Sequence, residues 1–222
     1  MSAEKIYIVI PAYNEAVFIR ATLEAVLSIG RYQIVVVDDG STDDTFAIAR
    51  SLVPTLRHAT NRGMGAALAT GTAYALRDGA LYIVHFDADG QHRAEEIEHL
   101  LGPLLENRAD IVIGSRYLQK HEVPWTKKYL IHKPALVLQN LITGLRLTDV
   151  HNGFRAMNRH AATRIVIRQD RMAHASEIIH EVKRNRLRFT EVPVTISYHE
   201  YGQGMREGLR VYFDLLTKRF FK

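Results

Sequence analysis

IYIVIPAYNE, residues 6–15, is the stretch that decides the fold. Five hydrophobic residues, most of them β-branched, run without a break into Pro11 and then into a polar cluster that ends at Glu15. A short, uninterrupted run of this kind is typical of a strand that is buried on both faces. The same order recurs at residues 34–41 (IVVVDDGS), 81–91 (LYIVHFDADGQ) and 110–116 (DIVIGSR). The sequence therefore predicts four buried strands whose ends carry polar residues.

Segments with helical spacing of apolar residues separate these strands. Asn14 is expected to cap a helix that continues to about Ile29, and Ser41 or Thr42 to cap the next one. Further helices are expected at 66–76, 95–105, 173–184 and 205–221, and a further strand at 191–198. This alternation predicts an α/β fold, a doubly wound, mainly parallel sheet in a single domain over residues 1–222. Ligands of such sheets bind beyond the carboxyl ends of the strands, where the polar clusters should meet.

Composition sets limits on function. The chain has 222 residues, of which 47% are hydrophobic and 24% charged, the balance of a globular protein. It has no cysteine, which excludes disulfides, thiolate zinc sites and thiol nucleophiles and fits a reducing cytoplasm. The first residues do not have the pattern of a signal peptide, and no apolar run approaches the roughly 18–20 residues that span a bilayer. We therefore expect no membrane span.

The chain is basic, with a formal net charge of +5. A positive balance favours an anionic partner, which could be nucleic acid, a phosphorylated small molecule or an anionic membrane surface. Composition does not choose among these three. Arg and Lys are denser from Arg155 onward.

Asp87, Asp89 and Gln91 form the first candidate site. In an extended segment, residues two apart point the same way, so their oxygens could share one face. Carboxylate and amide oxygens suit a hard cation such as Mg²⁺ or Mn²⁺, which would stabilise the charge of a departing nucleoside diphosphate. The alternative is a solvated turn in which an Asp caps the helix that begins near Glu95. The position after a buried strand favours the metal site.

Two other segments are ambiguous. In Asp38-Asp39-Gly40-Ser41 the side chains could form a turn and a helix cap, or a carboxylate could accept hydrogen bonds from a base or a ribose. The glycine-rich run at 61–65 does not fit a dinucleotide fingerprint, because Leu68 stands where the third glycine belongs. It predicts either a close approach of backbone to a ligand or the sheet, or a plain loop. None of the eleven histidines has recognisable zinc spacing, and most are expected to be solvated or satisfied locally.

Five motifs together resemble the family 2 glycosyltransferases. They are Pro11-Ala12-Tyr13-Asn14-Glu15, Val36-Val37-Asp38-Asp39-Gly40-Ser41, Asp87-Ala88-Asp89-Gly90-Gln91-His92, Gly114-Ser115-Arg116-Tyr117 and Asp149-Val150-His151-Asn152-Gly153-Phe154-Arg155. Within the family, the chain is most similar to the dolichyl-phosphate mannose synthase and polyprenyl-phosphate glycosyltransferase group. The motifs come in the family's order, and the resemblance covers about residues 6–215.

The resemblance implies a GT-A fold, inversion at the anomeric carbon, a GDP- or UDP-linked sugar as donor and no nucleic-acid partner. Positions that match the nucleotide-binding set are Pro11, Tyr13, Glu15, Val37 and Asp39. Asp87, Ala88 and Asp89 match the donor and metal segment, with Asp89 and Gln91 as metal ligands. Arg116 matches an arginine that binds the diphosphate or the acceptor phosphate. The implied acceptor is a polyprenyl phosphate or, alternatively, a sugar hydroxyl of a glycan.

The acceptor residues depart from the family pattern. An arginine of the family falls on Lys133, and a C-terminal Arg and Lys are replaced by His199 and Met205, with Arg206 adjacent. Lysine binds phosphate as a point charge, without the two-pronged guanidinium. Arg116, Lys133 and Arg206 are the candidates for an acceptor phosphate, which is already anionic and requires no base. A hydroxyl acceptor would need one, and Glu177 is the candidate, unless it is an exposed carboxylate on a helix surface.

Residues 204–222 predict a terminal amphipathic helix with basic flanks. It could pack on the domain, lie in a membrane interface or form a dimer contact. We expect a cytoplasmic protein, peripheral on the cytoplasmic membrane face if that helix binds lipid. Two other function classes remain open. A nucleotidyltransferase should carry a glycine-rich phosphate loop near its N-terminus, and a receiver-like module would use Asp38 and Asp39 but not Asp89 and Gln91.

Overall fold

A seven-stranded mixed sheet forms the centre of the molecule. The computed structural model describes residues 5–118, 145, 147–149 and 152–197. Its strands are β1 (Ile6–Ala12), β2 (Gln33–Asp38), β3 (Thr55–Arg57), β4 (Tyr82–His85), β5 (Ile111–Ser115), β6 (Arg155–Asn158) and β7 (Phe189–Pro193). They lie in the order β3-β2-β1-β4-β6-β5-β7. Only β6 runs antiparallel to its neighbours among these seven strands, so the expectation of a mainly parallel sheet is confirmed.

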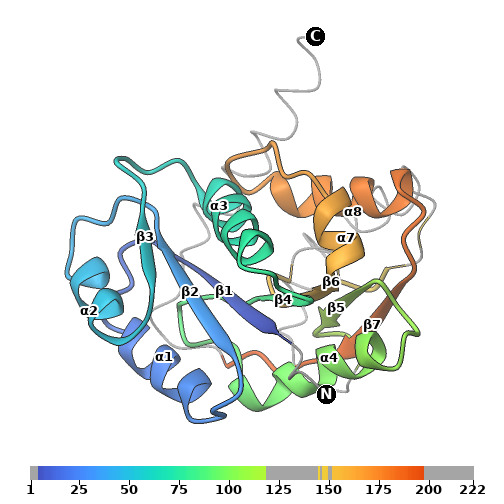
Figure 1. Ribbon diagram of the computed structural model, residues 1–222, viewed down its shortest axis with the longest axis horizontal. Helices are drawn as coiled ribbons and strands as arrows, with labels where there is room; N and C mark the ends of the chain where they lie inside the picture. The colour runs from blue at the N-terminus through green and yellow to red at the C-terminus, as the bar shows by residue number, and fades with distance from the viewer. Residues whose placement is uncertain (1–4, 119–144, 146, 150–151, 198–222) are drawn as a thin grey trace, which may run out of the picture.

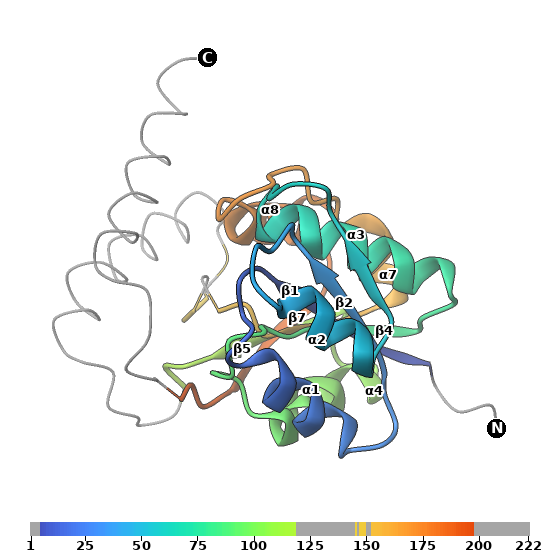
Figure 2. The same cartoon turned by 90° about the vertical axis from the view of Figure 1, so that its left-hand side faces the viewer.

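Helices cover both faces of the sheet (Figures 1 and 2). One face carries α1 (Ile19–Leu27), α2 (Thr45–Leu52), the short 3₁₀ turn η1 (Ala94–Glu96) and α4 (Ile97–Leu105). The other carries α3 (Met64–Arg77), α7 (Arg159–Arg164) and α8 (His174–Arg184). Alternate residues of β1 enter the two layers: Ile8 and Ile10 face α1 and α4, whereas Tyr7 and Val9 face α3. This alternation is what a strand buried on both faces requires.

The expected helix caps are wrong. Asn14 has a left-handed φ of 55° and precedes a turn, so α1 begins only at Ile19. The Asn14 side chain instead accepts the backbone N–H of Thr42 at 2.9 Å. Neither Ser41 nor Thr42 caps α2, which begins at Thr45. The two segments bond to each other because they lie side by side at the sheet edge.

The carboxyl ends of β1, β2, β4 and β5 lie at the same edge of the sheet, as the parallel pairing requires. Three elements were not predicted: β3, β6 and α7. The expected strand at 191–198 is shorter and begins earlier, as β7. The expected helix at 205–221 lies outside the described residues. No helix in the described part of the chain has the length and apolar character that would let it cross a membrane.

Candidate active site

The loop after β1 is tied to the loop after β2. The Asn14 N–H donates to the Ser41 hydroxyl at 3.0 Å, and the Glu15 N–H donates to the Thr45 hydroxyl at 2.7 Å. These bonds hold the polar segment 13–16 over the sheet edge, where Pro11 is buried and the Tyr13 side chain is 44% exposed. An exposed aromatic ring at this edge is available to a ligand.

Glu15 belongs to a group of carboxylates of like charge. Its pKa is raised to about 7 by burial and by the charges of Asp89, Asp43 and Asp87. The pKa of Asp89 is also raised, by burial and by Asp87. For Asp87, burial raises the pKa, but the hydrogen bond with His92 and the charges of His92, Arg155 and His174 together outweigh it, so the net shift is downward. Carboxylates that repel one another across this space leave an excess of negative charge that a cation would relieve.

The segment from Asp87 to Gln91 is a turn and not the extended run that the spacing assumed. β4 ends at His85, Gly90 has a φ of 71°, and Asp89 Oδ1 accepts the Gln91 N–H at 3.0 Å. Ala88 between the two aspartates is buried, and its carbonyl accepts the Thr22 hydroxyl at 3.1 Å. The two carboxylates therefore come together through a turn anchored on α1. The Gln91 side chain makes no hydrogen bond to another described residue.

Asp87 is positioned by His92, whose imidazole packs against two phenylalanine rings. His92 Nε2 lies 3.0 Å from Asp87 Oδ2, and the imidazole packs against Phe154 and Phe86 with ring centroids 4.7 and 5.5 Å away. Gly153 permits this placement, because a Cβ there would lie 2.4 Å from Asp87 Oδ2. Thus His92 and Gly153, both inside the recognised motifs, fix one of the predicted metal ligands.

Asp39 at the end of β2 is held by the loop that follows β3. Its carboxylate accepts the N–H of Gly63 at 2.6 Å and of Arg62 at 3.0 Å, and His58 Nδ1 lies 2.6 Å away. The predicted role of Asp39 toward a nucleotide stays a prediction; its observed role is to fix the glycine-rich loop. That loop approaches the connection between α7 and α8, because a Cβ at Gly63 would lie 2.4 Å from the Asp170 carbonyl. Val37, also predicted to bind nucleotide, is fully buried.

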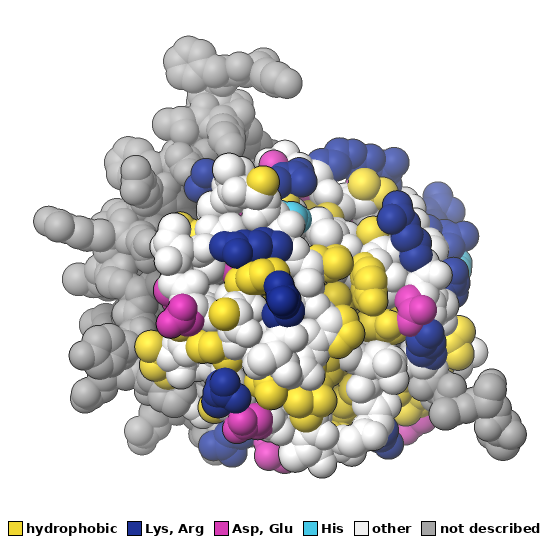
Figure 3. All heavy atoms as spheres, turned by 60° about the vertical axis from the view of Figure 1, so that its left-hand side comes forward, with side chains coloured by type: hydrophobic (Ala, Val, Ile, Leu, Met, Phe, Trp, Pro, Cys, Tyr) yellow, Lys and Arg dark blue, Asp and Glu magenta, His cyan; other side chains and the backbone are white. Residues whose placement is uncertain are grey.

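Asp38 pairs with a stack of basic and aromatic side chains. Arg57 Nε lies 3.1 Å from Asp38 Oδ2. The guanidinium of Arg57 also lies over the Phe46 ring at 4.5 Å, and that of Arg50 over the same ring at 5.8 Å. On the α2 and β3 face, basic side chains accordingly lie next to apolar ones (Figure 3).

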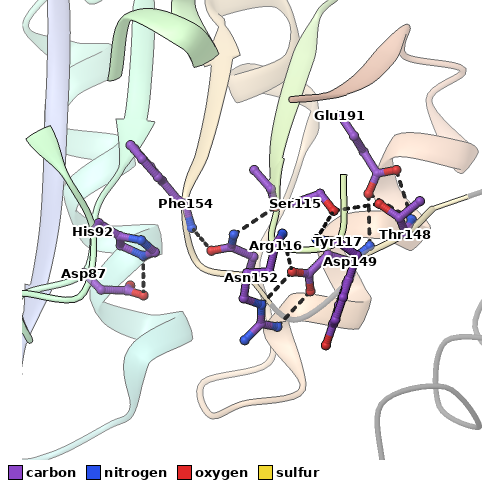
Figure 4. A network of polar contacts seen from close by, with 11 residues as sticks. Asp87, His92, Ser115, Arg116, Tyr117, Thr148, Asp149, Asn152, Phe154 and Glu191 are labelled. Carbon is purple, nitrogen blue, oxygen red and sulfur yellow. Dashed lines mark hydrogen bonds and ion pairs between the residues drawn. The ribbon is translucent and has the colours of Figure 1, made fainter. Parts of the chain in front are cut away.

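Arg116, directly after β5, is bound by Asp149. Its Nε donates to Asp149 Oδ2 at 2.7 Å and its Nη2 to Oδ1 at 2.8 Å, a two-pronged pair that Figure 4 shows beside Asn152. The Thr148 and Ser115 hydroxyls lie 2.7 Å apart, and Glu191 of β7 accepts the N–H groups of Thr148 and Asp149. The motifs at 114–117 and 149–155 therefore meet in space.

Three buried basic side chains, His85, Arg155 and His174, lie close enough to Asp87 to interact with its charge. His85 is 1% exposed, and burial together with Arg155 and His174 lowers its pKa to about 3, so it is neutral. Burial lowers the pKa of the Arg155 guanidinium to about 10, whereas Asp87 and Asp149 raise it. Arg155 therefore stays charged at neutral pH and contributes a fixed positive charge near both aspartates. His85 is an exception to the expectation of solvated or locally satisfied histidines, because its Nε2 contacts the Thr72 hydroxyl at 3.0 Å inside the core.

The remaining predicted site residues are not gathered here. Glu177 accepts the N–H groups of Arg168 and Gln169, both at 2.8 Å, so its carboxylate holds the connection before α8. Lys133 and Arg206 lie outside the described residues. Sequence reasoning did not single out His58, Asp149 as the partner of Arg116, or Glu191. Asp149 had a signal, its place in a motif; the other two depend on contacts between distant segments.

Residues 7–166 match the family described as glycosyl transferase family 2. The chain belongs to this family. It is 36% identical to an uncharacterized protein of Methanocaldococcus jannaschii, with 100% of this chain and 95% of that protein aligned. It is 30% identical to a UDP-N-acetylglucosamine–dolichyl-phosphate N-acetylglucosaminyltransferase of Methanococcus voltae, over 100% of this chain and 99% of that one. A polyprenol monophosphomannose synthase of Mycolicibacterium smegmatis is also 30% identical, over 94% and 83%.

The fold of this family 2 glycosyltransferase matches solved structures. Glucosyl-3-phosphoglycerate synthase from Mycobacterium tuberculosis, in complex with Mn²⁺, UDP and phosphoglyceric acid, superposes with a TM-score of 0.75 at 19% identity. The match covers 97% of this chain and 78% of that one. This likeness confirms the expected GT-A-like fold in a single domain.

Proposed function

We propose that this glycosyltransferase moves a sugar from a GDP- or UDP-linked donor to a polyprenyl phosphate, with metal dependence and inversion at the anomeric carbon. One observation carries the proposal: the like-charged carboxylates Glu15, Asp87 and Asp89 lie at the same sheet edge as the Arg116–Asp149 pair. An excess of negative charge next to a held arginine suits a metal-bound diphosphate and a second phosphate. Relatives aligned over most of this chain are named for sugar transfer to polyprenyl phosphates.

The carboxylates fit a divalent cation. Asp87, Asp89 and Gln91 would hold Mg²⁺ or Mn²⁺, and the raised pKa values of Glu15 and Asp89 reflect the charge that such an ion would balance. Within the described residues, no group of three or more His, Cys, Asp or Glu could hold a metal ion by itself. In the proposed site, donor phosphates would complete the ligand set. When bound, the ion would supply Lewis-acid stabilisation of the leaving diphosphate.

The protein's own residues would bind and orient the two substrates. Tyr13 and Asp39 follow the ends of β1 and β2 and would receive the nucleoside of the donor, next to Pro11 and Val37, which are buried in those strands. Arg116 would hold a phosphate in line with the anomeric carbon, because a guanidinium binds phosphate through two parallel hydrogen bonds. A phosphate oxygen is already a nucleophile, and one in-line displacement inverts the configuration. This route leaves Glu177 to hold the backbone that it contacts in the structure.

The reaction would take place at a membrane surface, because a polyprenyl phosphate is anchored in a bilayer. The test is incubation with GDP-mannose or UDP-N-acetylglucosamine, and with undecaprenyl or dolichyl phosphate, in Mg²⁺, Mn²⁺ or excess EDTA. We expect a sugar–phosphate–lipid product and free nucleoside diphosphate, formed only with metal. A parallel thermal-shift series with GDP, UDP, dTDP and CDP should identify the cognate nucleotide, since a ligand that binds only the folded state raises the melting temperature. Transfer to a saccharide hydroxyl with no product on lipid phosphate would contradict the proposal.

A further inference from the structure

Glu191 makes contacts that no sequence motif predicted. Its two carboxylate oxygens lie 2.9 Å each from the Thr148 N–H, and Oε1 also accepts the Asp149 N–H at 3.0 Å. The side chain is half-buried, and burial raises its pKa while the amides of Thr148 and Asp149 oppose the rise. A partly desolvated carboxylate that accepts hydrogen bonds from two consecutive backbone amides restrains the conformation of that backbone.

The backbone fixed in this way carries the partner of Arg116. Asp149 is 2% exposed and receives three bonds from Arg116: from Nε at 2.7 Å, from Nη2 at 2.8 Å and from the backbone N–H at 3.2 Å. The adjacent Thr148 hydroxyl lies 2.7 Å from that of Ser115, whose oxygen accepts the Tyr117 N–H. These hydrogen bonds join the 148–149 segment to Glu191 on one side and to the segment after β5 on the other.

Sheet pairing closes the arrangement into a ring. β5 and β7 are parallel neighbours, with Ile113 opposite Glu191, so Glu191 lies in register with the strand that leads to Arg116. The path runs from β7 through Glu191 to the 148–149 backbone, through Asp149 to Arg116, and back along β5 (Figure 4). A side chain held in such a ring has few alternative rotamers.

We propose that Glu191 is a positioning residue for Arg116 in sugar transfer: it holds the 148–149 backbone so that Asp149 presents both carboxylate oxygens to the guanidinium. This inference rests on the phosphate-binding role given to Arg116 under the proposed function. Arginine has four side-chain torsions and gains specificity only when its guanidinium plane is fixed, because phosphate is bound by two parallel N–H groups. Release of the 148–149 backbone would let that plane turn away from the reacting phosphate.

The test is a double-mutant cycle of Glu191→Gln and Arg116→Lys, measured as kcat/KM for undecaprenyl phosphate. Glutamine keeps one acceptor oxygen but places an NH₂ group against the Thr148 N–H. We expect Glu191→Gln to lower kcat/KM by roughly 10- to 100-fold in the wild-type background, since a small misplacement can have effects of this size. In the Arg116→Lys background the same substitution should have almost no further effect, because lysine has no plane to orient.

Glu96→Gln is the matched control. Glu96 also accepts one backbone amide through both oxygens, that of Thr195 at 3.0 and 2.9 Å. Its carboxylate makes none of the hydrogen bonds that join Glu191, Asp149 and Arg116. We expect this variant to keep its kcat/KM even if its melting temperature falls. If Glu191→Gln fails to fold, Glu191→Asp replaces it in the cycle, since the shorter side chain keeps the charge but draws the carboxylate away from the Thr148 and Asp149 amides.

Two results would overturn the inference: wild-type turnover of Glu191→Gln, or an equal loss in both Arg116 backgrounds. Binding of farnesyl phosphate, measured by calorimetry, repeats the cycle without turnover. If the wild type transfers no sugar to lipid phosphate, the proposed reaction fails. The inference about Glu191 is then decided by farnesyl phosphate affinity alone. It is supported if the effects of the two substitutions on that affinity are not additive, and overturned if they are.

Discussion

Two carboxylates at the amino end of the central sheet, Asp110 and Asp78, are matched by donors, whereas two at the carboxyl end, Glu15 and Asp89, lie among carboxylates of like charge. At the amino end, Asp110 accepts hydrogen bonds from Arg188 and Asn158, and the Arg188 contact holds the pKa of Asp110 well below its usual range. Asp78, next to the start of β1, pairs with Lys5 and Tyr7, which lower its pKa. At the carboxyl end, the pKa values of Glu15 and Asp89 are raised.

This difference indicates which carboxylates contribute to stability and which contribute to function. A carboxylate whose charge is matched by donors adds to the free energy of unfolding, whereas carboxylates that repel one another lower it. Such groups cluster at functional sites because the ligand provides the missing opposite charge. Substitutions at the two ends should therefore differ in kind: removal of a carboxylate at the amino end lowers stability, and removal at the carboxyl end lowers activity.

Asp89→Asn should have the largest effect. We expect a loss of metal-dependent donor turnover of at least about 10²- to 10³-fold, the range observed when one electrostatic stabiliser of the transition state is removed. The melting temperature without metal should stay the same or rise, because the substitution relieves repulsion from Asp87. Turnover and thermal unfolding, each with Mg²⁺ and with EDTA, provide the measurement. Full activity of the variant, or of the wild type in EDTA, would show that the metal assignment is wrong.

Asp39→Ala tests an intermediate case. Asp39 lies at the carboxyl end of the sheet, but its carboxylate is matched by hydrogen-bond donors. Its bonds to Arg62, Gly63 and His58 resemble those of Asp110, so some loss of stability is expected. We expect the loss of nucleotide affinity to exceed the loss of stability. The affinity should fall by about 10- to 100-fold, as for the loss of a hydrogen bond to a charged group. Calorimetric titration with the cognate diphosphate measures this effect. Unchanged affinity would leave Asp39 only the role of holding the loop.

Asp110→Asn should sharpen the comparison from the other end. The substitution weakens the Arg188 contacts, and we expect the free energy of unfolding to fall by about 1–2 kcal/mol, with sugar transfer unchanged. Because the folded pKa is lowered, the wild-type contribution is present above the ordinary value of 3.8 and is lost as pH falls through the folded pKa. Denaturant unfolding at pH 7 and at low pH checks both statements.

The sequence predicts most of this arrangement, but not the contacts between distant segments. β1, β2, β4 and β5 are recognisable because each is an apolar run followed by polar residues. β6 is not, since its four residues include a fully buried arginine, Arg155, whose burial depends on the charges around it. Asp87 and Asp89 are recognisable from their spacing, although a turn brings them together. Glu191 and His58 have no local signal, because their partners lie 42 and 19 residues away.

The smallest expected effect is a dependence of stability on pH that arises from Glu15. Its folded pKa is about 7, above the ordinary value of 4.5, so the folded state keeps its proton longer than the unfolded state. The free energy of unfolding should therefore fall as pH rises from 4.5 to 7. Because the group is half-exposed and solvent screens its neighbours, the fall should be on the order of 1 kcal/mol. Glu15→Gln should flatten this part of the pH profile and leave the acid limb, where Asp110 titrates, unchanged. Mg²⁺ with the cognate diphosphate should flatten it in the wild type as well, if the ion balances the same charge. A wild-type profile that stays level from pH 4.5 to 7 without ligand would mean that burial and the neighbouring aspartates do not raise the pKa of Glu15.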